Sequence, residues 1–150
     1  MSRFSISVLS AVAALVVVVP ASATSTAPLF TVARVINHAS LGTIFSCVNT
    51  GATPTTVTVV NVVDGSGATI GTGTSATLNQ DQTWVFGTTI LNGFDEDTNM
   101  GLANSLDNGS AKIVSTSKAV MCNAFIADTL GSPPASMTTL RVVGGTKQKV

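Results

Sequence analysis

The chain has 150 residues, which is enough for one domain and not comfortably for two. Only 9% of its residues are charged, and 7 Lys and Arg balance 7 Asp and Glu. Nucleic-acid binding needs clustered Lys and Arg that neutralise phosphates, so this composition excludes nucleic acid as a partner. The low charge and the abundance of Val, Thr, Ser, Gly and Asn favour strands and turns over helices.

Residues 1–23 predict a signal peptide. A basic start at Arg3 precedes an apolar run over 4–19, and Ala21-Ser22-Ala23 supplies the small-x-small pattern that signal peptidase cleaves. The run is shorter than the ~20 residues of a spanning helix, so cleavage after Ala23 is favoured over a membrane anchor. We therefore expect a secreted or periplasmic protein whose mature chain, 24–150, has no membrane span.

The mature chain predicts an all-β fold of about eight short strands, with frequent turns and no amphipathic helix. This pattern is typical of a single antiparallel β-sandwich. Asp64-Gly65-Ser66-Gly67 predicts a tight hairpin turn, and Thr116-Ser117 predicts a second turn that pairs the strands on either side of it. The expected strand runs are 29–36, 43–49, 55–63, 68–72, 76–78, 83–86, 109–115, 118–127 and 136–143.

Cys47 and Cys122 are the only cysteines, and both lie in apolar, strand-like runs. In an exported chain an even number of cysteines predicts a disulfide, so we expect these two to be bonded. Their Cα atoms must then lie within about 7 Å.

Four stretches carry a resemblance to a known group of proteins. They are F-S-C-V-N-T from Phe45, V-V-D-G-S-G-A-T-I from Val62, G-S-A-K-I-V-S-T-S-K-A-V-M-C-N-A-F-I-A-D from Gly109 and S-M-T-T-L-R-V-V from Ser136. Together they resemble small exported bacterial immunoglobulin-like proteins of uncharacterised function. The resemblance implies an immunoglobulin-like fold and export, and it carries no site residues.

The stretch 88–108 lacks clear periodicity and contains the densest cluster of acidic residues. Asp95, Asp97 and Asn99 have the D-x-D-x-N spacing that opens a calcium loop. However, Met100 and Leu106 stand where that motif needs Gly and a bidentate carboxylate. These residues are therefore a weak calcium candidate, and we expect no metal and no cofactor.

Two functions from different classes remain. Asp95, Glu96, Asp97 and Asp107 share the acidic loop 94–107 in this interpretation, and paired carboxylates are the groups that a glycoside hydrolase uses. His38 is the only histidine and lies among turn residues. With no thiolate, no nucleophile elbow and no phosphate loop, the favoured function is a secreted, non-catalytic module. We expect a binding, adhesion or envelope-structural role, with an extracellular protein or a glycan as partner.

Overall fold

The computed structural model describes residues 28–62, 66–102 and 105–144, and these residues form an all-β fold with ten strands and no helix. The expected all-β class is therefore confirmed, while the predicted signal peptide and residues 64–65 of the first predicted turn lie outside the described residues. The strands are β1 Phe30–His38, β2 Leu41–Asn49, β3 Val57–Val62, β4 Thr69–Thr74, β5 Thr83–Gly87, β6 Thr98–Asn99, β7 Leu106–Ser115, β8 Val120–Asp128, β9 Met137–Leu140 and β10 Val142–Gly144.

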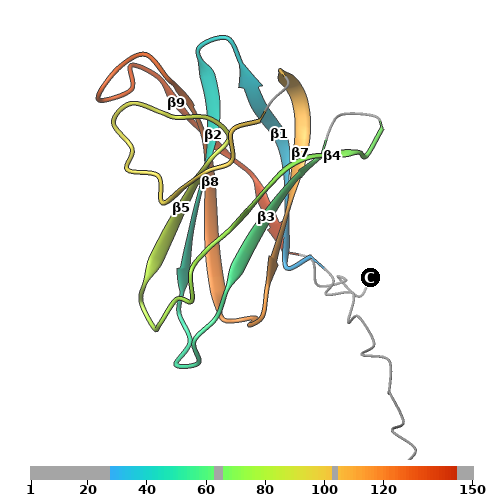
Figure 1. Cartoon of the computed structure of the whole chain (residues 1–150), viewed down its shortest axis with the longest axis vertical. Coiled ribbons are helices and arrows are strands. Elements are labelled where there is room, and N and C mark those ends of the chain that lie inside the picture. The colour runs from blue at the N-terminus through green and yellow to red at the C-terminus, as the bar shows by residue number, and fades with distance from the viewer. Residues whose placement is uncertain (1–27, 63–65, 103–104, 145–150) are drawn as a thin grey trace, which may run out of the picture.

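The strands form one nearly closed sheet in the order β4-β3-β7-β1-β2-β5-β6, with β8, β9 and β10 off this path (Figure 1). One half contains β5, β2, β8 and β9, and the other contains β4, β3, β7, β1 and β10. The halves are joined where β1 and β2 pair next to their turn, and again where the chain passes from β9 to β10. The two ends of the strand order, β4 and β6, contact each other. Every pairing of named strands is antiparallel except that of β5 with β6.

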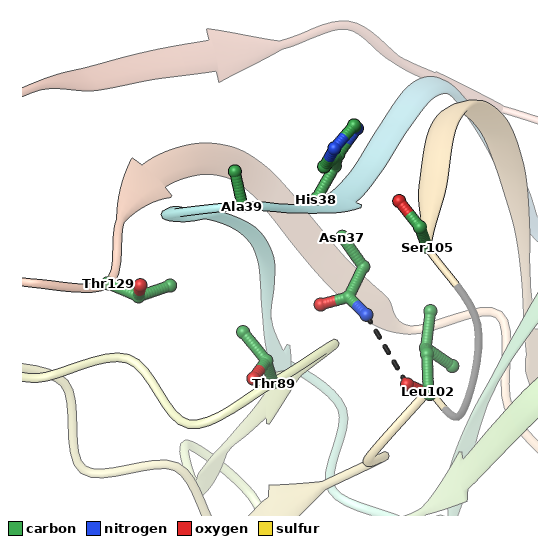
Figure 2. A pocket seen from close by; sticks show the side chains of 7 residues that line it. All are labelled: Asn37, His38, Ala39, Thr89, Leu102, Ser105 and Thr129. Carbon is green, nitrogen blue, oxygen red and sulfur yellow. Dashed lines mark hydrogen bonds between the residues drawn. The ribbon is translucent and has the colours of Figure 1, made fainter.

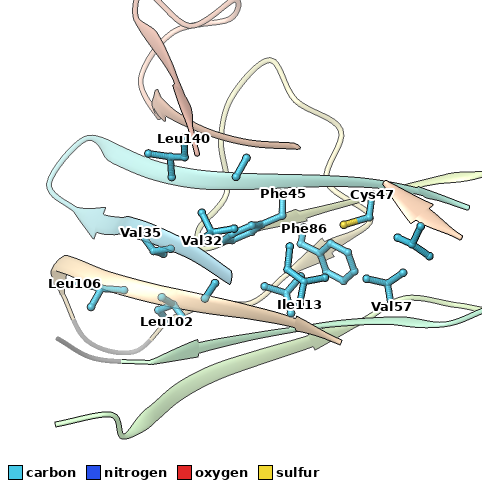
Figure 3. Packing of buried hydrophobic residues seen from close by; sticks show 14 of the residues in the cluster. Val32, Val35, Phe45, Cys47, Val57, Phe86, Leu102, Leu106, Ile113 and Leu140 are labelled. Atoms are coloured by element: carbon cyan, nitrogen blue, oxygen red, sulfur yellow. The ribbon is translucent and has the colours of Figure 1, made fainter. Parts of the chain in front are cut away.

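The main apolar core lies between the two halves, as Figure 3 shows, and a smaller cluster of Ile44, Leu91 and Ala127 is separate from it. Phe45 and Phe86 enter the main core from one half, and Val32, Val57 and Ile113 enter it from the other, and all five are fully buried. Alternate residues of a strand point to opposite faces, so the β-branched runs present one apolar side to this core. Burial of each large side chain stabilises the fold by about 1.5–3 kcal/mol.

Strand β1 contains a bulge that interrupts this alternation. Val32 and Val35 are buried, whereas Ala33 and Arg34 between them are both exposed. The register with β7 shifts at this point, and Arg34 has a φ of 63°. A bulge places two residues of one strand against one of its partner and redirects their side chains.

Several predicted elements were wrong in detail. Residues 76–78 form no strand, since Leu78 makes only an isolated bridge with Thr55. The expected last strand is divided at Arg141 into β9 and β10, which pair with different halves. Strand β7 begins at Leu106, inside the stretch that was predicted to lack regular structure.

The predicted hairpin through Thr116-Ser117 is also wrong, because β7 and β8 do not pair. Strand β7 pairs with β1 and β3, and β8 pairs with β2 and β9, so the connection crosses from one half to the other. The hydroxyls of Ser115 and Ser117 accept hydrogen bonds from the backbone N–H groups two residues ahead, at 3.2 and 3.1 Å. These local turns satisfy the backbone without strand pairing.

Candidate functional site

Three connections meet at the end of the molecule that holds the β1–β2 turn. The backbone N–H of Thr129, after β8, donates to the carbonyl of Ser40 at 2.7 Å. The Asn92 side chain donates to the Thr129 carbonyl at 3.0 Å, and that of Asn37 donates to the Leu102 carbonyl at 3.4 Å. We use the name loop end for these hydrogen-bonded segments together. They are residues 38–41, 88–97, 100–102 with 105, and 129–136.

An open hollow of about 370 Å³ lies at the loop end, and Figure 2 shows its lining residues. Its lining mixes hydroxyl, amide and imidazole groups with short apolar side chains. The lining residues are Asn37, His38, Ala39, Thr89, Leu102, Ser105 and Thr129. Because these residues come from parts of the chain far apart in sequence, folding alone assembles the hollow.

His38 lies in this lining and forms an ion-pair contact with Asp107. The Nδ1 atom of the ring faces Oδ1 of the carboxylate, with side chains 54% and 73% exposed, respectively. The sequence analysis grouped Asp107 with the acidic loop, but it lies on β7. The preceding residue, Leu106, pairs with Asn37 of β1, and this pairing places Asp107 beside the end of β1. Such an exposed pair is well solvated and contributes little to stability.

The carboxylates of the acidic loop hold the backbone of their own region. Glu96 accepts a hydrogen bond from the backbone N–H of Leu91 at 2.8 Å, and Asp97 accepts one from Val85 at 2.7 Å. These bonds attach the loop to β5 and fold it back on itself. The structure therefore gives both carboxylates a structural role.

The weak calcium candidate is spread along this same segment. Asp97 directly precedes β6, and Asn99 is the last residue of β6 and accepts a hydrogen bond from the N–H of Gly101 at 2.9 Å. Asp95 precedes them and is exposed. Within 28–62, 66–102 and 105–144, no three His, Cys, Asp or Glu side chains are grouped closely enough to hold a metal ion.

Sequence reasoning missed two large apolar side chains at the loop end. Ile90 is 65% exposed and directly follows Thr89 of the hollow, and Leu130 is 78% exposed and directly follows Thr129. Ile90 lies in the aperiodic stretch 88–108, and Leu130 lies between the expected strands 118–127 and 136–143, so neither was expected in a strand. An isolated large aliphatic residue among turn-forming residues was the available signal for them.

Cys47 and Cys122 face each other across β2 and β8, with their Cα atoms 4.1 Å apart and their sulfurs bonded. The predicted proximity of the two residues is confirmed. The pair lies away from the loop end, because the β2–β8 register reaches that end only at Leu41 and Asp128. The bond therefore joins the strands that carry the loops and does not contribute to the hollow.

The fold and these contacts define an all-β domain with a bonded cysteine pair and a polar hollow among its loops. Searches of family models, of curated proteins and of solved structures returned no match for this chain. The described part of the chain also contains no helix of the length and apolarity needed to cross a membrane.

Proposed function

We propose that this protein is an exported, non-catalytic binding module with an immunoglobulin-like β-sandwich fold, and that it binds an extracellular partner through its loop end. The two halves of the sheet enclose one common core, which supports a sandwich. The bonded cysteines are typical of an oxidising compartment outside the cytoplasm, and the signal-peptide pattern of residues 1–23 agrees with that destination.

One observation carries the proposal: exposed Ile90 and Leu130 directly follow Thr89 and Thr129, two lining residues of the polar hollow, on loops that are hydrogen-bonded to one another. Exposed aliphatic side chains next to polar groups suit recognition, because the former are desolvated on contact and the latter fix orientation. Loops on a rigid scaffold frequently carry binding residues. Since the hydrogen bonds hold these loops before contact, less ordering entropy is lost on binding.

The test uses the purified exported protein and the surface of the cells that produce it. The double variant Ile90→Ser with Leu130→Ser should reduce the amount bound at a fixed protein concentration by roughly tenfold or more, as expected when two central apolar contacts are lost. Met121→Ser is the matched control, because Met121 is 64% exposed but lies near the far end of β8. Equal binding by both variants would refute the assignment to the loop end.

The non-catalytic part of the proposal has its own test. Purified protein should show no glycosidase, esterase or protease turnover, and the variants His38→Ala and Asp97→Ala identify the source of any turnover that does appear. Turnover that persists through purification and disappears with either substitution would favour the hydrolase instead. His38→Ala probes the His38–Asp107 pair beside Ser105, and Asp97→Ala probes the acidic loop.

A further inference from the structure

A second hollow, of about 390 Å³, lies where β9 ends and β10 begins. Its lining is mainly apolar and includes Ile126 and Leu140, while Thr138 and Thr139 line it from β9. Arg34 and Arg141 complete the lining. The volume is in the range of small-molecule sites.

The path of the chain creates this hollow. Strand β9 pairs with β8 in one half, and after Arg141 the chain joins β1 in the other half as β10. Strand β1 pairs with β2 only beside their turn, at Asn37 and His38, and with β10 only over residues 30–32. The part of β1 between residues 32 and 37 therefore borders β9, with no other strand between β1 and β9.

The bulge in β1 explains why both arginines line the same hollow. Continuing the β1–β10 register beyond Val32↔Val142 places Ala33 opposite Arg141. In a regular strand Arg34 would then point to the opposite face. The bulge and the left-handed φ of 63° at Arg34 break that alternation, and Arg34 lines the hollow together with Ala33. A left-handed backbone at a long non-glycine side chain is uncommon, and strained residues of this kind cluster at functional sites.

The charge in this place is unusual for such a sparsely charged chain. The described residues include only two arginines, Arg34 and Arg141, and both line this one hollow. Within the described ranges neither of them is ion-paired to a carboxylate, since the pair found there is His38 with Asp107. Both arginine side chains are exposed and therefore open to a ligand from solvent, and their planar N–H forks match carboxylate and phosphate oxygens.

We propose that this hollow binds a small ligand in which a carboxylate or phosphate group is attached to an apolar chain. The two guanidinium groups hold the oxyanion, and Ile126 and Leu140 contact the apolar part. The site is separate from the loop end and does not depend on its function.

Isothermal titration and amide NMR shifts of the purified exported protein test this proposal with four probes. Octyl phosphate and octanoate should bind, and their relative affinities distinguish the two oxyanions. Inorganic phosphate and 1-octanol, which each lack one part of the ligand, should bind roughly tenfold or more weakly. Shifts should centre on residues 33–34, 126 and 138–141.

The variants separate charge from fold. Arg34→Gln and Arg141→Gln should each weaken binding of octyl phosphate roughly tenfold, and Arg141→Lys should weaken it less. Lys112→Gln and Lys118→Gln are matched controls, because both lysines are exposed and lie outside this hollow. Thermal melts confirm that each variant is folded, and the Ile90→Ser with Leu130→Ser variant should retain full binding of the probe.

Three results would overturn the proposal. They are the absence of any shift up to millimolar octyl phosphate, equal binding of 1-octanol, and equal losses with the lysine and arginine variants. Failure at this site leaves the loop-end proposal untouched, because the two tests use different residues and different ligands.

Discussion

Two fully buried asparagines differ in how far the hydrogen-bonding groups of their side chains find partners. Asn49 on β2 donates to the carbonyls of Thr53 and Leu78, both at 3.0 Å, and accepts from the N–H of Gly51 at 3.0 Å. Asn61 on β3 donates to the sulfur of Met100 at 3.1 Å, and its Oδ1 has no partner among the described residues. Asn49 thus anchors the turn after β2, while Asn61 leaves a buried polar atom uncompensated.

Replacing each asparagine by leucine, whose side chain has the same number and branching of heavy atoms, should separate the two cases. Asn49→Leu should lower the free energy of unfolding by about 2–4 kcal/mol, because several hydrogen bonds are lost and their partners stay partly buried. Asn61→Leu should change it by about 1 kcal/mol or less, because the desolvation cost of its amide disappears too. Urea denaturation of both variants measures the difference, and equal losses would contradict this account.

At the scale of elements, the connection from β8 to β9 is organised by one carboxylate. Asp128, the last residue of β8, accepts hydrogen bonds from the N–H groups of Ser136 at 2.9 Å, Gly131 at 3.1 Å and Leu130 at 3.2 Å. The bond from Ser136 is the main cause that lowers the pKa of Asp128 below its usual 3.8. Partial burial opposes this shift, while Gly131, Leu130 and Ala135 add to it. The charged carboxylate therefore holds the backbone of Leu130, which directly follows Thr129 in the lining of the loop-end hollow.

This arrangement predicts a pH dependence confined to the connection. Because the folded-state pKa of Asp128 is lowered, its stabilisation is present above pH 3.8 and is lost as the pH falls through the lowered pKa. The amide NMR signals of Ser136 and Gly131 should shift with a midpoint below 3.8. Asp128→Asn should abolish that titration, whereas Asp81→Asn, remote in sequence and outside these hydrogen bonds, should not. A midpoint above the usual value would contradict the assignment.

At the scale of the whole molecule, the disulfide closes a sequence separation of 75 residues. It joins β2, which pairs with β1, β5 and β8, to β8, which follows the crossing between the two halves. In the chain-entropy model a loop of this length gives about 4 kcal/mol of stabilisation, because the bond restricts the unfolded chain.

The double variant Cys47→Ala with Cys122→Ala should therefore melt roughly 10–20 °C below the oxidised protein. Reduction of the original protein should produce a comparable shift. Ser46→Ala with Asn123→Ala is the matched control, because these residues form the adjacent facing pair on the same two strands. If reduction leaves the melting temperature unchanged, the disulfide does not carry this share of the stability.

Local patterns in the sequence were enough to predict the all-β fold class and the positions of many of the strands. The runs that became β1, β2, β3 and β8 were predicted to within a few residues, because β-branched content and period-two alternation act over neighbouring residues. The proximity of Cys47 and Cys122 followed from their number and their place in apolar runs, and the geometry agrees with it.

Only the tertiary structure decided which strand edges meet. The periodicity of 109–115 fits pairing with β8 as well as with β1 and β3, and the choice depends on which halves enclose the core. That choice brings Asp107 to His38, and Arg34 and Arg141 to one hollow. It also imposes the left-handed backbone at Arg34, where the sequence offers no glycine. Short-range propensity specifies each strand, but contacts between residues far apart in sequence are fixed only when the whole sheet closes on its core.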